Sequence, residues 1–127
     1  MILIVDDDVA LADMCSMVLE SHGYQTGLAS GGSEALEKLK LGSYELVISD
    51  CAMPGMSGPE LTEQIKGDPS TSHVPVMLMS ASLRRDVAGG TACGGFIRKP
   101  FLAENFVAMV KDMLAPKACS AVQYCEV

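Results

Sequence analysis

The segment "YELVISDCAMPGMSG", Tyr44–Gly58, runs from an apolar stretch onto an aspartate and then into a loop of small residues, proline and glycine. Its "LVIS" part, Leu46–Ser49, is a short run of apolar and β-forming residues, as is "ILIV", Ile2–Val5. Such runs are typical of strands covered on both faces of a sheet. They predict two central strands, and Asp50 comes at the end of one of them.

Helical periodicity follows the first of these strands. Leu11, Met14, Cys15, Val18 and Leu19 are spaced i, i+3, i+4, i+7 and i+8. This spacing predicts an amphipathic helix, with Asp8 as its cap and Gly23 as its stop signal.

The remaining elements are predicted by the same two patterns. Weaker or shorter strands are expected at residues 24–29, 74–80 and 95–99, with Pro75 at the entrance of one of them. A helix is expected to open with Ser57 and Glu60 as a capping box and to end near Gly67. Other helices are expected before Gly42 and over residues 102–113.

Strand and helix thus alternate along the chain, with the weakest evidence for the fourth helix. This alternation predicts an α/β fold, a parallel sheet with helices on both faces, whose ligands bind beyond the carboxyl ends of the strands. Polar residues that follow the predicted strands should therefore meet at one edge of the sheet. These residues are Asp6, Asp7, Asp50, Ser80 and Lys99.

Composition narrows the classes of protein. The chain has 127 residues, enough for one domain, and a net charge of −7 with no run among its nine Lys and Arg residues, so we expect no direct contact with nucleic acid. No apolar stretch reaches the roughly 18 residues of a membrane span, and the first residues lack the pattern of a signal peptide, so we expect a cytoplasmic protein that no membrane holds. The five cysteines are odd in number and scattered, which favours reduced thiols over zinc ligands or disulfides.

Four segments, "ILIVDDD", "LVISDCAMPGMSG", "VMLMSA" and "FIRKPF", together resemble the receiver domain of two-component response regulators. The resemblance implies a doubly wound, five-stranded parallel sheet of order 2-1-3-4-5, which is the flavodoxin-like or CheY-like fold. It covers residues 1–115 as a receiver domain and leaves residues 116–127 as a C-terminal tail. The segment "AGGTACGG" holds four glycines, which predict a shortened or irregular fourth helix.

The resemblance also implies a site. Asp50 would accept a phosphoryl group, and Mg²⁺ would be held by Asp7, Asp50 and the backbone carbonyl of Ala52, with Asp6 binding through water. Mg²⁺ prefers oxygen ligands and keeps several waters, and phosphoryl transfer needs its charge near the equatorial oxygens, so the residue types suit this chemistry. Asp8 is expected to act as a helix cap rather than as a ligand.

Three further residues complete the implied site. Ser80 would donate its hydroxyl to a phosphoryl oxygen, and Lys99, carried by a cis peptide bond to Pro100, would supply a positive charge. Movement of Ser80 would let Phe96 swing inward, so that Ser80 and Phe96 form a switch. Phe96 stands where the family often has tyrosine and lacks its hydroxyl, so we expect this switch to act through packing.

The implied function is that of a signalling domain and not of an enzyme, with self-catalysed phosphorylation and slow autodephosphorylation. The donor would be a sensor histidine kinase or a histidine phosphotransfer protein, and the target a downstream protein or a fused output domain. Alternatives remain at this point. A degenerate receiver could serve only as a binding module, and a haloacid-dehalogenase-type phosphatase would need an acid where Ala52 stands. A flavin-binding module would need a phosphate loop where the acidic "DDDVAL" stands.

Overall fold

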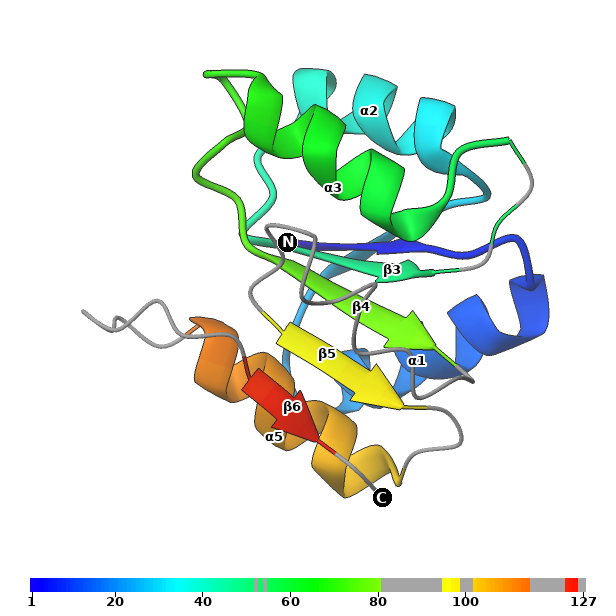
Figure 1. Ribbon diagram of the computed structural model, residues 1–127. Coiled ribbons are helices and arrows are strands. Elements are labelled where there is room, and N and C mark those ends of the chain that lie inside the picture. Colours follow the sequence, from blue (N-terminus) through cyan, green and yellow to red (C-terminus); the bar gives the residue numbers. More distant parts are fainter. Residues whose placement is uncertain (52, 54, 81–94, 99–101, 115–122, 126–127) are drawn as a thin grey trace.

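The structure is a computed structural model that describes residues 1–51, 53, 55–80, 95–98, 102–114 and 123–125. Six parallel strands form one sheet in the order β2-β1-β3-β4-β5-β6 (Figure 1). The strands are β1 Ile2–Val5, β2 Thr26–Ala29, β3 Leu46–Asp50, β4 Val76–Ser80, β5 Gly95–Arg98 and β6 Gln123–Cys125. The predicted parallel order 2-1-3-4-5 is confirmed, and a sixth strand extends it.

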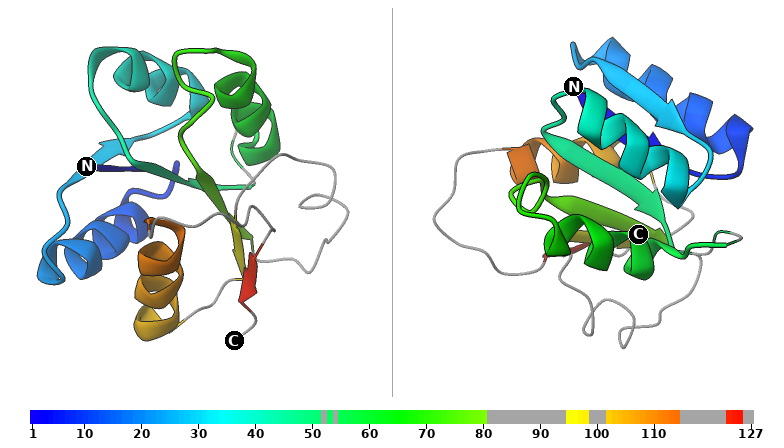
Figure 2. Two further views of the ribbon diagram at one scale, coloured as in Figure 1. Left: turned by 90° about the vertical axis from the view of Figure 1, so that its left-hand side faces the viewer. Right: turned by 90° about the horizontal axis from the view of Figure 1, so that it is seen from above.

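Helices cover both faces of the sheet (Figures 1 and 2). The described helices are α1 Val9–Ser21, α2 Gly32–Leu41, α3 Gly58–Gly67 and α5 Ala103–Leu114. Helices α2 and α3 pack on one face, and α1 and α5 on the other. The segment predicted to form a shortened fourth helix lies outside the described residues.

The central strands are buried on both faces because each of their apolar side chains enters one of two cores. In β1, Leu3 packs with α2 and α3, whereas its neighbour Ile4 packs with α1 and α5. Val47 and Ile48 of β3 divide in the same way. Successive side chains of a strand point to opposite faces, so a strand with helices on both sides must be apolar throughout. This is the physical origin of the two apolar runs in the sequence.

The predicted helix caps are present. The side chain of Asp8 accepts a hydrogen bond from the amide of Leu11 at 3.3 Å, at the start of α1. Ser57 and Glu60 form the capping box of α3, which ends at Gly67 as expected. Both caps satisfy amides that have no partner within the helix. They determine where the chain turns from a strand into a helix.

Two strands begin two residues later than the sequence predicts. Tyr24 does not open β2, because its amide donates to the carbonyl of Leu19 and completes the turn after α1, where Gly23 has φ +91°. Residues 74 and 75 likewise precede β4, although the carbonyl of Pro75 accepts a hydrogen bond from the amide of Val47 at 3.0 Å. The sheet contacts therefore extend slightly beyond the regular strands.

Strand β6 was not predicted from the sequence. It lies in the segment expected to be a tail, and it pairs in parallel with β5, with Gln123 opposite Gly95 and Cys125 opposite Ile97. A segment of three residues carries no measurable periodicity, so only the sheet edge beside it makes it a strand. The C-terminal segment therefore contributes to the sheet.

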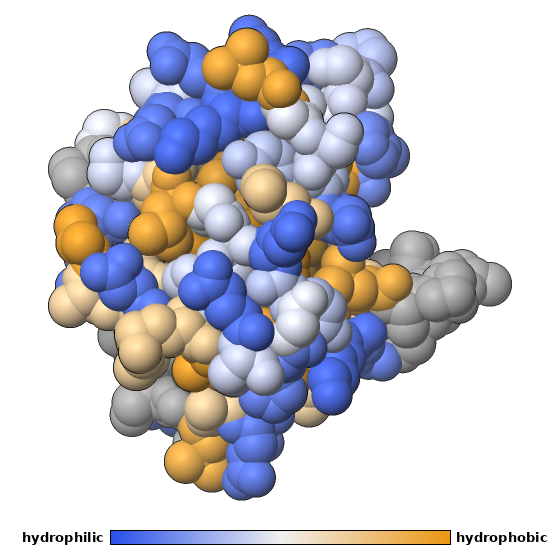
Figure 3. Space-filling view, turned by 180° about the vertical axis from the view of Figure 1, so that it is seen from behind, coloured by the Kyte–Doolittle hydropathy of each residue, from blue (hydrophilic) through white to orange (hydrophobic). Residues whose placement is uncertain are grey.

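A few large apolar side chains are exposed on the described surface. Figure 3 shows apolar residues scattered among hydrophilic ones on the face seen from behind. The exposed large apolar side chains among the described residues are Met1, Val9, Met14, Met17, Leu41 and Leu102. Within the described part of the chain, no helix combines the length and the apolar character needed to cross a membrane.

Candidate functional site at the carboxyl edge of the sheet

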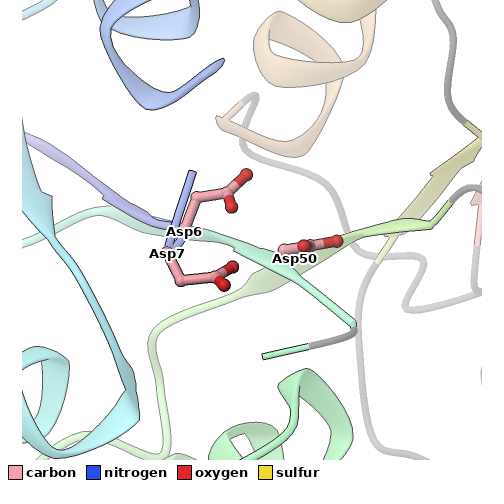
Figure 4. A group of neighbouring side chains, drawn as sticks. All are labelled: Asp6, Asp7 and Asp50. Carbon is pink, nitrogen blue, oxygen red and sulfur yellow. The ribbon is translucent and has the colours of Figure 1, made fainter. Parts of the chain in front are cut away.

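Three carboxylates meet at the ends of two neighbouring strands. One oxygen from each of Asp6, Asp7 and Asp50 lies within 4.8 Å of the others (Figure 4). Asp6 and Asp50 are buried, with 1% and 9% of their surface exposed, whereas Asp7 is exposed. Strands β1 and β3 are paired in parallel with Val5 opposite Ser49, so the residues after them necessarily lie side by side. The predicted meeting of these three acids at one edge is confirmed.

The backbone around Asp6 holds this group in place. The amide of Asp6 donates to the carbonyl of Ala29 at 3.1 Å, which continues the pairing of β1 with β2 beyond the last strand residue. The amide of Asp8 donates to Oδ1 of Asp6 at 2.9 Å. The turn that leads into α1 therefore orients one acid of the cluster, while Asp8 itself caps the helix.

Asp50 is positioned by the entry into α3. The amide of Cys51 donates to the carbonyl of Met79 in β4 at 2.8 Å, and the amide of Gly58 donates to the carbonyl of Cys51 at 2.9 Å. A Cβ atom on Gly58 would lie 2.4 Å from the carbonyl oxygen of Asp50. Only glycine allows the first turn of α3 to pack this closely on the backbone that carries Asp50.

Sequence reasoning did not assign Gly58 any part in the site. A signal was present, because glycine is a poor helix former and stands here inside the first turn, directly after the capping Ser57. A glycine at such a position indicates a close approach of another backbone.

The three carboxylates fit a hard divalent cation. Mg²⁺ binds oxygen at 2.0–2.1 Å, so opposite ligands of its octahedron lie roughly 4 Å apart. Oxygens that all lie within 4.8 Å of one another can therefore share one ion, either directly or through a bound water. Three like charges at this separation repel one another, and a cation relieves that repulsion. Asp6, Asp7 and Asp50 could thus hold Mg²⁺.

The structure brings one further predicted residue to this edge and leaves others undescribed. Ser80 ends β4, one position beyond Met79, which is paired with Asp50, and it is half-buried. Ala52, Lys99 and the Lys99–Pro100 peptide bond lie outside the described residues. The backbone of Phe96 lies in β5 opposite Leu78, but its side chain is not among the described groups.

Two of the five cysteines bear on the prediction of reduced thiols. Cys15 of α1 is buried in the core, and Cys51 is half-buried. Neither forms a disulfide. Cys93 and Cys119 lie outside the described residues.

The fold and the acid cluster define a class, namely a doubly wound α/β domain with a group of acids at the carboxyl edge of its sheet that could hold a cation. Comparison with known proteins gives the family. The model of the response regulator receiver domain matches residues 2–111. The chain belongs to this family of two-component signalling domains.

Individual relatives support membership in this family. The DNA-binding response regulator MtrA of Mycobacterium tuberculosis is 34% identical over 116 residues, which are 89% of this chain and 50% of MtrA. Chemotaxis protein CheY-3 of Vibrio cholerae is 36% identical over 106 residues, 80% of this chain and 82% of CheY-3. A crystal structure of response regulator TrrA of Thermotoga maritima in complex with Mg²⁺ and BeF is also similar. It matches with a TM-score of 0.80 at 32% identity, and the match covers 88% of this chain and 96% of the TrrA chain.

These relatives bear on three expectations. Membership in the family confirms the CheY-like fold and favours neither the phosphatase, nor the flavin module, nor the degenerate binding module. The chain spans about half the length of MtrA and its counterparts, the first of the curated relatives that it matches. The names of those regulators conflict with the expectation that nucleic acid is not contacted, which rested on the acidic charge of this segment alone.

Proposed function

We propose that Asp50 accepts a phosphoryl group from a phosphohistidine, in a reaction that requires Mg²⁺. The observation that supports this proposal most directly is the group formed by Asp6, Asp7 and Asp50, whose carboxylate oxygens lie within 4.8 Å of one another at the carboxyl edge of the sheet. Asp50 ends a central strand, and the family is one of signalling phosphoacceptor domains. The donor is a sensor histidine kinase or a histidine phosphotransfer protein.

The chemistry assigned to Asp50 is a displacement at phosphorus. A carboxylate oxygen attacks the phosphoryl group, a P–O bond forms, and the P–N bond to the donor imidazole breaks with its electron pair leaving on nitrogen. Asp7, Asp50 and the carbonyl of Ala52 would hold Mg²⁺, with Asp6 binding through water. The bound ion supplies positive charge beside the transferred oxygens.

Ser80 and Lys99 assist the phosphorylated state in this proposal. The hydroxyl of Ser80 donates to one phosphoryl oxygen, and the ammonium group of Lys99 pairs with another. Ser80 ends the strand next to β3, which supports this role. Movement of Ser80 then makes room for the ring of Phe96, and this packing change carries the signal to the surface around β5.

The output of the switch is a downstream protein or a fused output domain. About half of the length of the MtrA-type relatives lies outside the segment that matches this chain, whereas CheY-3 is matched over 82% of its length. Both arrangements use the same receiver. We further propose that the domain catalyses its own phosphorylation from small donors and loses the group slowly.

Incubation with acetyl phosphate and Mg²⁺, followed by intact-mass measurement, tests this function. We expect the wild-type chain to gain one labile phosphoryl group, and EDTA to prevent the gain. The Asp50→Asn variant should gain none. Asp13→Asn is a matched control, because Asp13 is an exposed acid of α1 outside the cluster, and it should react at the wild-type rate. Phosphorylation of Asp50→Asn at the wild-type rate would refute the assignment.

A further inference from the structure

Strand β5 would be an edge strand in the five-stranded order predicted for this fold. An edge strand presents a row of N–H and C=O groups that can pair with another extended segment. In the structure these groups face β6, which continues the sheet in parallel (Figure 1). The edge of β5 is therefore a surface that accepts a strand.

The connection that brings β6 to this edge has an unusual hand. Helices α1 and α5 lie on the same face of the sheet (Figures 1 and 2). The crossover through α1 leads from β1 toward the β2 edge, whereas the crossover through α5 leads from β5 toward the opposite edge. Two crossovers between parallel strands have opposite handedness when they lie on the same face of the sheet but lead toward opposite edges.

The remaining described crossovers identify which hand is the exception. Helix α3 lies on the other face and leads from β3 to β4, in the same direction as α5, so it has the same hand as the α1 crossover. Helix α2 lies on the same face as α3 and leads from β2 to β3 in the same direction, so its crossover has the same hand. About 98% of such crossovers are right-handed. The β5-α5-β6 crossover is therefore left-handed, against a strong preference.

The preference for one hand applies only when the connection belongs to the same chain as the strand it leaves. A β6 strand from another molecule can take the same place on β5 without any crossover. Residues 115–122 connect α5 to β6 and can extend to roughly 25 Å, so β6 can reach beyond its own sheet. Strand β6 also carries no charged residue that would oppose pairing.

We propose that the edge of β5 is a strand-exchange surface, and that its occupant is β6 of a second copy of this chain. Each molecule donates Gln123–Cys125 to the β5 strand of the other, with the register seen within one chain. The exchange keeps every strand contact and replaces a left-handed crossover by an intermolecular connection. Such reciprocal exchange closes as a two-fold dimer and needs no new surface.

Substitution of β6 in the full-length chain tests the proposal. The variant Gln123→Pro/Tyr124→Pro removes two consecutive amide donors, one of which faces β5 because they alternate in direction along a strand. The matched control Gln123→Ala/Tyr124→Ala keeps both donors. All chains also carry Asp50→Asn, so that the result does not depend on phosphorylation or on the proposed function.

Light scattering after size exclusion, over a range of concentrations, measures the association. We expect the parent and the alanine variant to dimerise, and the proline variant to dimerise at least tenfold more weakly. A synthetic peptide of residues 119–127 should bind to the proline variant and slow hydrogen exchange of the β5 amides. A parent chain that stays monomeric with protected β5 amides would show that β6 binds only its own sheet and would overturn the proposal. Equal dimerisation of the proline and alanine variants would overturn it as well.

Discussion

Asp50 is held in place by backbone contacts on both sides of the loop that follows it. Cys51 is paired with β4, and Gly58 returns to donate to the carbonyl of Cys51. These contacts set the direction in which Asp50 leaves the sheet, so a change in the packing of α3 must move the candidate phosphoacceptor. At the scale of single residues, Gly58 is thus as important for the geometry as the acids.

The substitution Gly58→Ala tests this role. Its Cβ atom would meet the carbonyl oxygen of Asp50 at 2.4 Å and the Cα atom of Cys51 at 2.9 Å, and both are backbone atoms that cannot rotate away. We expect a loss of about 1–3 kcal/mol of unfolding free energy, as for other overpacked sites, together with slower phosphorylation from acetyl phosphate. Urea denaturation and the mass assay measure the two effects.

Gly67→Ala is the matched control, because Gly67 belongs to the same helix and an added Cβ meets nothing within 4 Å. We expect this variant to gain about 0.5–1 kcal/mol and to keep the wild-type phosphorylation rate. Similar stability of the two alanine variants would contradict the close contact described at Gly58.

The start of helix α2 is organised by a side chain from within its first turn. The N-cap residue, Gly31, has no side chain to offer, and Oε1 of Glu34 instead accepts hydrogen bonds from the amide of Ser30 at 3.0 Å and from its hydroxyl at 2.8 Å. Oε2 of Glu34 pairs with Lys38 at 3.2 Å. The Ser30 donors, and to a lesser extent Lys38, lower the pKa of Glu34 from 4.5 to about 2.

This lowered pKa predicts a pH dependence of stability. The folded state prefers the charged form of Glu34, so its contribution is complete above the unfolded pKa near 4.5 and is lost as pH falls toward 2. We expect Glu34→Gln to be less stable than wild type at pH 6, and the difference to shrink steadily below pH 4.5. The contribution is small because Glu34 is exposed to solvent and screened.

Urea denaturation of both chains between pH 6 and pH 3 measures this difference. Glu37→Gln is the control, because Glu37 lies on the same helix and is exposed, and no bond to it is described. A difference between Glu34→Gln and wild type that does not change with pH would contradict the role assigned to the carboxylate.

A second contact joins α2 to the loop after Asp50. A Cβ atom on Gly32 would lie 2.6 Å from Sδ of Met56, whereas a Cβ atom on Gly31 would meet nothing within 4 Å. We expect Gly32→Ala to shift the loop that carries Met56 and to change the rate of Asp50 phosphorylation, whereas Gly31→Ala should not. Met56→Gly, which removes Sδ and also the Cβ atom that lies 2.9 Å from the added Cβ, should relieve the clash and restore the rate in the Gly32→Ala background. Equal rates for the Gly31 and Gly32 variants would reject this coupling.

On the scale of the whole molecule, three acidic side chains lie close together at the carboxyl edge of the sheet. Two unit charges 4 Å apart repel by about 1 kcal/mol in water and by about 4 kcal/mol at the dielectric of a protein surface. Asp6 and Asp50 are both buried, and the chain is already acidic. We expect this repulsion to lower the stability of the fold, and a bound cation to relieve it.

Thermal unfolding with and without Mg²⁺ tests whether the three acids repel one another and whether a cation relieves this repulsion. We expect Asp50→Asn to be more stable than wild type by on the order of 1 kcal/mol without metal, because it removes one of three repelling charges. Mg²⁺ should stabilise wild type by binding only the folded state, and should stabilise Asp50→Asn much less. The control Asp13→Asn should respond to Mg²⁺ as wild type does. An equal metal response in Asp50→Asn and wild type would show that the ion binds elsewhere.

The described helices, the strands β1 to β5 and the members of the acid cluster could be predicted from the sequence alone. Apolar runs such as Ile2–Val5 can be buried only between two layers of helices, and caps such as Ser57 act on amides in their own turn. Both signals are local, so they can be read without knowledge of the fold. Parallel pairing then places Asp6, Asp7 and Asp50 at the same edge.

Contacts between segments that are distant in the sequence could be found only in the folded structure. The need for glycine at position 58 arises from the backbone of β3, and the need for glycine at position 32 arises from Met56. Strand β6 has no pattern of its own, and it exists because β5 offers an unpaired edge. In each case the residue responds to a partner that its neighbours in sequence do not reveal, and only folding brings that partner into contact.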